Sequence, residues 1–196
     1  MAMTVEYCFP CGDWPRTLVE GSGGAPGNGV ERISEPMKKD GVVTETQSTG
    51  PHRFQMDGWI SCAPFERLLN MEILEAVDGR AVLTMPFHVD YAQGAGLMHG
   101  GALVSLADTA TVMAIKSIIE PRSHFATILL EAKFHAPIRQ GMVTAKARVV
   151  HREGRTLKGR AEIRDAEGRV VMEVNSTFRI ARDATIRGVI FDEEGA

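Results

Sequence analysis

An aspartate inside an apolar segment is the first indication of chemistry in this chain. Asp108 lies between Gly100 and Ile119, where most residues are apolar. The positions three and four residues away on either side hold Val104, Ser105, Thr111 and Val112. Because none of these is a cation, burial of the carboxylate would be costly. The placement favours an active-site base or nucleophile facing a cleft; the alternative is a carboxylate paired across strands or at a subunit contact.

A pair of glycines precedes this aspartate. Gly100 and Gly101 stand where the apolar helix begins, so their N–H groups have no partner within the helix. The helix dipole adds partial positive charge there, and glycine lets a ligand approach the backbone closely. These features suit a developing oxyanion, although a plain glycine-rich turn has the same pattern.

The spacing of these two features bears on how they could cooperate. Eight helical residues between Gly100 and Asp108 correspond to a rise of about 12 Å, too far for both to touch one carbonyl carbon. The carboxylate would therefore come from a neighbouring helix or act through water. We expect a dimer whose two helices lie side by side.

Secondary-structure signals surround this helix on both sides. The sequence predicts a short helix at Ala63–Leu69, then strands at Met71–Val77 and Arg80–Phe87 joined by an Asp-Gly turn. Four strands follow the long helix, and the last three alternate apolar and polar residues. An α+β fold results: a curved antiparallel sheet of about six strands around one long buried helix, with a short N-terminal helix.

The ends of the chain differ from this core. Residues 1–57 are rich in Gly, Pro, Ser and Thr and are expected to form a disordered extension; residues 58–182 form the domain and 183–196 a tail. Cys8 and Cys11 form a C-x-x-C without the second pair that a zinc site needs, so no metal is expected. Three sparse cysteines fit a reducing compartment.

Composition narrows the class of protein. The net charge is -3, and no long apolar run or secretory signal is present, so we expect a cytoplasmic protein that binds neither nucleic acid nor membrane.

The stretch His99-Gly100-Gly101, followed by Leu106-Ala107-Asp108-Thr109-Ala110, resembles the hotdog-fold thioesterases of the phenylacetate-pathway (PaaI-like) type. The resemblance covers roughly residues 60 to 181. It implies a hotdog fold, hydrolysis of acyl-CoA to acid and free CoA, and a homodimer or homotetramer with the active site at the subunit interface. No cofactor is expected.

The resemblance also implies catalytic roles. The Gly100 N–H would polarise the thioester carbonyl, and Asp108 of the other subunit would be the general base or nucleophile. Gln93 would orient the carbonyl or water, at a position where PaaI-like members usually have Asn. His99 would support the site, and Thr127 would help to hold the water; each could equally be an ordinary structural residue.

A basic stretch offers a place for the phosphates of CoA. Residues 139–164 contain eight basic and two acidic residues. Arg and Lys suit phosphate, although a solvated outer sheet face has the same composition. By resemblance, the nucleotide site includes Arg139, Arg152, Gly154, Arg155, Thr156 and Arg179.

Other readings of the same fold remain open. A non-catalytic acyl-CoA binder is the main alternative, and a hotdog dehydratase is a less favoured one. The acyl group is not indicated by the sequence. Its pocket is expected to be lined by Phe65, Leu68, Leu69, Phe87, Met98 and Met113.

Overall fold

The computed structural model describes residues 2–7 and 54–182. Its elements follow the order β1 (Ala2–Tyr7), α1 (Pro64–Leu68), β2 (Glu72–Val77), β3 (Arg80–Pro86), the 3-10 turn η1 (Val89–Tyr91), α2 (Gly100–Lys116), β4 (Phe125–Phe134), β5 (Met142–Glu153), β6 (Thr156–Arg164) and β7 (Val170–Ile180). Within this part of the chain, no helix is both long and apolar enough to cross a membrane.

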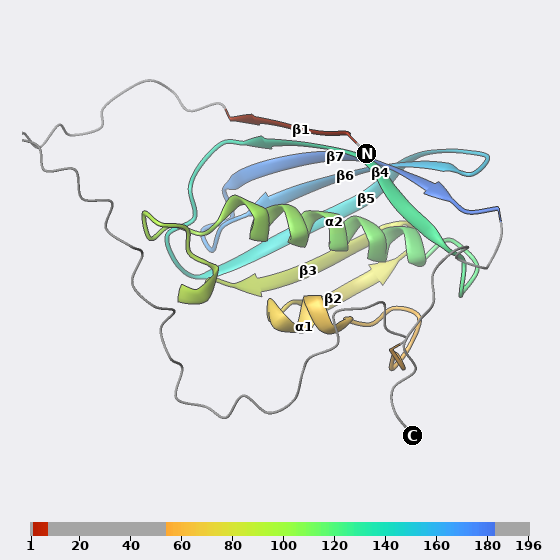
Figure 1. Ribbon diagram of the computed structural model, residues 1–196, viewed down its shortest axis with the longest axis horizontal. Coiled ribbons are helices and arrows are strands. Elements are labelled where there is room, and N and C mark those ends of the chain that lie inside the picture. Colours follow the sequence, from red (N-terminus) through yellow and green to blue (C-terminus); the bar gives the residue numbers. More distant parts are fainter. Residues whose placement is uncertain (1, 8–53, 183–196) are drawn as a thin grey trace, which may run out of the picture.

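All strands join one sheet, in the order β1-β4-β7-β6-β5-β3-β2. The six strands β2 to β7 pair antiparallel throughout. The sheet curves around α2, and α1 lies beside β2 and β3 (Figure 1). The expected sheet of about six antiparallel strands around one long helix, with a short helix before it, is thus confirmed.

Strand β1 adds a seventh strand that the sequence did not predict. Ala2–Tyr7 runs parallel to β4, with Ala2 opposite Leu129 and Tyr7 opposite Phe134. These six residues fall within the extension expected to be disordered. Their pairing has a simple cause, since β4 would otherwise present unpaired backbone N–H and C=O groups at the sheet edge. Cys8, Cys11 and the tail at 183–196 lie outside the described residues.

Helix α2 packs its apolar residues against the concave side of the sheet. Leu106, Ala110 and Ala114 are fully buried there. The closest approach is at β6, where a Cβ on Gly159 would lie 2.1 Å from Cγ2 of Thr111. Glycine at this position is therefore what allows the helix to sit so near the sheet.

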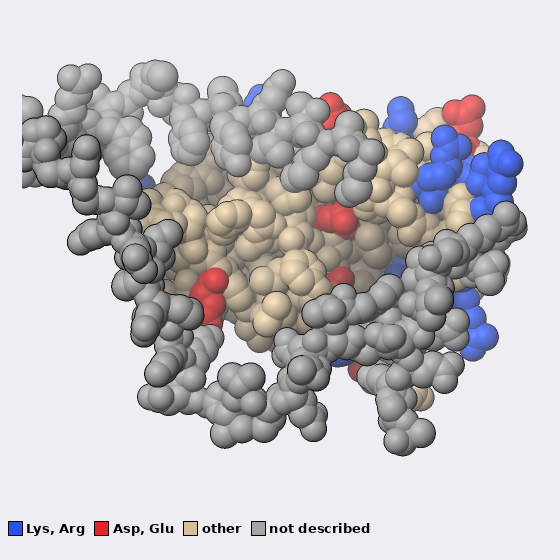
Figure 2. All heavy atoms as spheres, viewed as in Figure 1, with Lys and Arg blue, Asp and Glu red and all other residues tan. Residues whose placement is uncertain are grey.

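One stripe of α2 remains uncovered in the single chain. Ser105, Asp108, Val112 and Lys116 recur at helical spacing and stay partly exposed. Apolar residues nearly all round the helix predicted a fully surrounded element, and the single sheet covers only part of its circumference. The face of the molecule that carries α2 also has few charged side chains (Figure 2). The catalytic candidate Asp108 therefore opens outward, toward this face.

Candidate active site

The carboxylate of Asp108 is held by one side chain from the sheet. Thr127, on β4, donates its hydroxyl to Asp108, with Oγ1 3.0 Å from Oδ1 and 3.3 Å from Oδ2. Among the described residues, no cation forms an ion pair with Asp108. Burial raises the pKa of Asp108, and the hydrogen bond from Thr127 partly opposes this rise. The result is a partly buried carboxylate that is more basic than an exposed one.

The hydrogen bonds at the start of α2 engage two of its first three backbone N–H groups. His99 is the N-cap, and its Nδ1 accepts a hydrogen bond from the Gly101 N–H at 2.9 Å. The Ala102 N–H bonds the carbonyl oxygen of His99 at 3.0 Å. Within the described part of the chain, the Gly100 N–H meets no acceptor. Of the first three amides of the helix, Gly100 is therefore the one available to a ligand, and His99 is placed by its capping role.

The loop before the helix fixes Gln93. Its Oε1 accepts the Ala95 N–H at 2.7 Å, and its backbone N–H donates to the carbonyl oxygen of Leu97 at 2.8 Å. The loop joins the helix start through the His99 N–H, which donates to Tyr91 at 2.7 Å. The amide oxygen accepts one hydrogen bond, and the NH₂ group of Gln93 has no hydrogen-bond partner among the described residues, so this group is available to a ligand.

Gly100 and Asp108 lie on one helix, as the sequence predicted. Their separation along α2 is eight residues, or about 12 Å of rise. One chain therefore brings Asp108 together with Thr127, and His99 together with Gly100, but does not bring the two pairs together.

A cavity of about 260 Å³ opens next to the Asp108–Thr127 pair. Thr127, Phe125 and Phe178 line it from the sheet, and Val112 and Lys116 line it from α2. Trp59 also lines the cavity. Its indole N–H donates to the carbonyl oxygen of Lys116 at 2.9 Å, and Lys116 Nζ lies 5.0 Å from the centre of its ring.

The acyl-pocket lining predicted from the sequence differs from the lining of this cavity. None of the six expected residues lines this cavity. Met98 and Met113 are buried in the core instead, and Phe65 and Leu68 are exposed on α1. Lys116 was missed, although its spacing of four residues from Val112 and eight from Asp108 puts all three on one helix face.

The basic residues assigned to CoA fall into two places. Gly154 and Arg155 form the β5–β6 turn, Arg152 lies at the end of β5 next to it, and Thr156 pairs directly with Arg179 on β7. Figure 2 shows Lys and Arg gathered at the end of the molecule where Figure 1 places this hairpin.

The sixth residue of this set lies apart from the others. Arg139 precedes β5, so the whole length of that strand separates it from the turn. The structure therefore groups five of the six residues in one chain.

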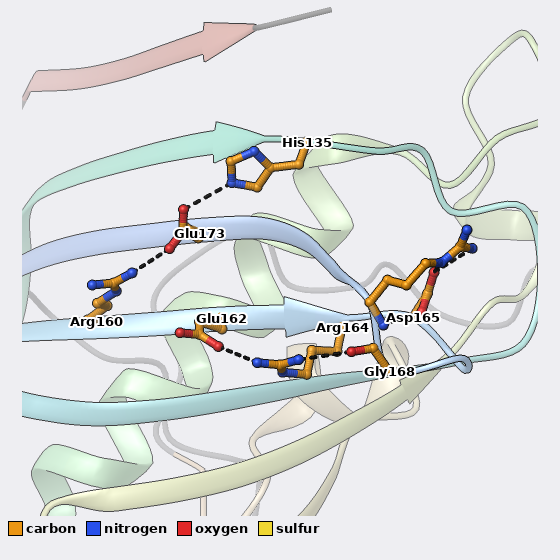
Figure 3. Close-up of polar contacts among 8 residues, drawn as sticks. His135, Arg160, Glu162, Arg164, Asp165, Gly168 and Glu173 are labelled. Atoms are coloured by element: carbon orange, nitrogen blue, oxygen red, sulfur yellow. Dashed lines mark hydrogen bonds and ion pairs between the residues drawn. The ribbon is translucent and has the colours of Figure 1, made fainter.

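Two of the basic residues on β6 have carboxylate partners. Glu173 receives hydrogen bonds from Arg160 and, at 3.0 Å, from His135, and Glu162 pairs with Arg164 at 2.7 Å (Figure 3). The hydrogen bond from Arg160 is the main reason that the pKa of Glu173 is lowered. These pairs offset the charges of Arg160 and Arg164, whereas neither Arg152 nor Arg155 forms an ion pair with a carboxylate among the described residues.

Residues of this domain match a family profile and are similar in sequence to known proteins. A profile described as the thioesterase superfamily matches residues 95–172, which include Gly100, Asp108 and Thr127. A protein of Halobacterium salinarum that carries the name of an esterase is 34% identical over 128 residues, covering 59% of this chain and 83% of that protein.

Solved structures agree with the same placement. The Escherichia coli PaaI protein from the phenylacetic acid degradation operon is 27% identical, with a TM-score of 0.57, over 61% of this chain and 85% of that one. A conserved Pseudomonas aeruginosa protein is 26% identical, with a TM-score of 0.60, over 63% of this chain and 97% of that one. The matched region is the curved sheet with its central helix.

Proposed function

Because the chain belongs to the thioesterase superfamily and has the hotdog fold, we propose that it hydrolyses acyl-CoA thioesters to a free acid and coenzyme A. One observation carries this proposal: Asp108 is a partly buried carboxylate without an ion-pair partner among the described residues, on the open stripe of α2. A pure binding protein gains nothing from such a costly group, whereas a base or nucleophile needs it.

The proposed reaction uses the groups described above. The Gly100 N–H donates a hydrogen bond to the thioester carbonyl oxygen and stabilises the negative charge that develops on it. Asp108 takes a proton from water, which attacks the carbonyl carbon; the tetrahedral intermediate then expels the CoA thiolate, which leaves as the thiol after accepting the proton. Direct attack by Asp108, followed by hydrolysis of the mixed anhydride, is the other route.

Supporting residues would hold these reactants in position. Thr127 fixes the rotamer of Asp108 through its hydrogen bond, and the NH₂ group of Gln93 would orient the carbonyl or the water. His99 keeps Gly101 occupied, so that the Gly100 amide alone faces the substrate.

We place the complete site between two copies of the chain. The open stripe of α2 and the sparsely charged surface around it suit contact with a second α2, which would bring Asp108 near the partner's helix start. A dimer that also joined the two β4 strands edge to edge would have to displace β1 from that edge. The same dimer could pair again into a tetramer.

The CoA nucleotide is assigned to the β5–β6 turn. Arg152, Arg155 and Arg179 would contact its phosphates, and Gly154 and Thr156 would shape the turn. Arg139 would take part only from another subunit, because it lies at the opposite end of β5.

A thiol-release assay with short, medium-chain and aromatic acyl-CoAs tests the proposed function. We expect turnover of at least one class, with one free thiol released per acid formed. Tight binding of acyl-CoA without thiol release would instead support the non-catalytic binder and overturn the hydrolase.

Replacement of Thr127 by Val should shift the pH dependence of the reaction. The hydrogen bond from Thr127 lowers the pKa of Asp108, so its loss raises that pKa further above the ordinary value. Since Asp108 acts in its ionised form, the acidic limb of the kcat/KM profile should move to higher pH. At acidic pH, kcat/KM should fall by about five- to tenfold, the effect of one lost hydrogen bond.

The matched control is Thr127→Ser, which keeps the hydroxyl and should keep the profile of the wild-type protein. An acidic limb that stays in place in Thr127→Val would show that Thr127 does not set the protonation of the catalytic group.

A further inference from the structure

A cation, Lys116, lines the cavity beside Asp108. Thr127, the partner of Asp108, lines it, and Val112 follows one helical turn after Asp108. Lys116 lies one turn further along α2, so the rise from Asp108 to Lys116 is about 12 Å. A substrate with its carbonyl at Asp108 and its acyl group along this cavity would therefore point the far end of the acyl group toward the ammonium.

The ammonium of Lys116 has no anionic partner in contact. Among the described residues, no carboxylate forms an ion pair with it, and the ammonium lies 5.0 Å from the centre of the Trp59 ring. Burial lowers the pKa of Lys116, and Glu66 acts in the opposite direction from a longer distance. Partial burial of a cation without an ion-pair partner costs free energy, and an anionic ligand in contact with it would offset that cost.

The remaining walls of the cavity agree with an acyl group that is apolar in the middle and polar at its end. Val112, Phe125 and Phe178 supply an apolar lining for methylene groups or a ring. Ser123 and His124 add polar groups to the same cavity as Lys116. This combination is unnecessary for an acyl group that ends in a methyl.

We propose that Lys116 is a specificity-determining residue that selects acyl-CoA thioesters whose acyl group ends in a carboxylate. The proposal rests on the proposed hydrolase function and names its substrate class. The distal carboxylate would accept a charge-assisted hydrogen bond from the ammonium, and the apolar lining would hold the carbons in between. The same cation could instead serve a phosphate of CoA, and the test separates these two anions.

The experiment compares adipoyl-CoA with hexanoyl-CoA, which have acyl chains of equal length and differ in the distal carboxylate. We expect the wild-type protein to show the higher kcat/KM with adipoyl-CoA. In Lys116→Met, the ratio of the two kcat/KM values should fall by about tenfold, the loss expected for one charged hydrogen bond. Lys116→Gln, which keeps a polar end, serves as the second variant if the methionine variant does not fold.

The control variant is Lys133→Met, which removes the same charge from an exposed position on β4. Lys133 lies six residues from Thr127, or about 20 Å along the strand, and its loss should leave the ratio unchanged. An unchanged ratio in both Lys116 variants overturns the proposal. An equal fall with both substrates also overturns it, since Lys116 would then act on the shared CoA moiety.

Failure of the proposal for Lys116 can be distinguished from failure of the proposed hydrolase function. If the wild-type protein hydrolyses neither of these thioesters nor any other acyl-CoA of the thiol-release panel, the hydrolase proposal fails. The dissociation constants of adipoyl-CoA and hexanoyl-CoA then decide the role of Lys116. Tighter binding of adipoyl-CoA than of hexanoyl-CoA, lost in Lys116→Met, would support the proposed role of Lys116. Equal binding of both thioesters by the wild-type protein would overturn that role.

Discussion

Asp108→Asn is expected to lower kcat for acyl-CoA hydrolysis by about a thousandfold or more, because the amide can neither accept the proton of water nor attack the carbonyl. The substitution keeps the shape of the side chain, and its amide oxygen can still accept the hydrogen bond from Thr127. Thiol release under saturating substrate measures the loss. Asp57→Asn, which removes the same charge from an exposed position before α1, is the control and should retain turnover.

The stability of the same variant provides an independent readout. Burial raises the pKa of Asp108 in the folded state above its ordinary value of 3.8, so the folded protein binds this proton more tightly than the unfolded chain does. Ionised Asp108 therefore destabilises the wild-type protein increasingly as the pH rises from that value through the raised pKa, and the full penalty is present above it. We expect Asp108→Asn to have the higher free energy of unfolding at neutral pH, with the difference shrinking on acidification.

Two results would contradict this account of Asp108. Undiminished turnover in Asp108→Asn would remove the residue from the mechanism. A marked loss of stability at neutral pH would show that the carboxylate is paired structurally, as an interface or cross-strand contact would require.

Gly100→Pro is expected to lower kcat by about a hundred- to a thousandfold, because it deletes the proposed oxyanion donor. Proline is well tolerated as the first residue of a helix, which is the position of Gly100 in α2. The preceding residue, His99, already has the extended backbone that a following proline requires, with φ -65 and ψ 132. The variant should therefore fold with its helix intact while losing one N–H group.

The matched control is Gly100→Ala, which keeps the N–H and adds the same Cβ. That Cβ would lie 3.2 Å from the ring of Phe134, so the Cβ of either variant requires the same small adjustment of the ring. We expect less than a tenfold loss for Ala. Equal activity of the Ala and Pro variants would show that the Gly100 amide is not the oxyanion donor.

Mixing the two inactive variants tests whether the site is shared between subunits. In a heterodimer of Asp108→Asn and Gly100→Pro, one of the two sites combines the intact Asp108 of one chain with the intact Gly100 of the other. Random reassortment should then restore about a quarter of wild-type activity, as the symmetry of an isologous dimer predicts. No recovery after subunit exchange would place both groups of each site in a single chain.

Much of the fold could be predicted from patterns within short segments of the sequence. Alternation at period two predicted β5, β6 and β7 and the face that each buries, because side chains in a strand point alternately to the two sides. The Asp78-Gly79 turn joins β2 and β3 as predicted, with both residues at positive φ. The apolar stretch from Gly100 predicted α2, although the helix ends at Lys116 rather than near Ile119.

The candidate catalytic residues could also be identified from short segments of the sequence. A carboxylate without a nearby cation and glycines at a helix start are properties of short segments, so Asp108 and Gly100 could be singled out before any fold was known. Their separation of eight residues along one helix also follows from the sequence alone.

Tertiary structure decided which side chains surround these groups. The hydrogen bond from Thr127 to Asp108 spans 19 residues, and the cavity that includes Trp59, Lys116 and Phe178 gathers residues from the N-terminal loop, α2 and β7. The pairing of Arg160 with Glu173 across two strands and the addition of β1 to β4 depend on sheet register in the same way. Such contacts are set by the curvature of the sheet and by how closely α2 approaches it. No periodicity within one segment encodes them, and for this reason helix α2 could be predicted from the sequence while the lining of this cavity could not.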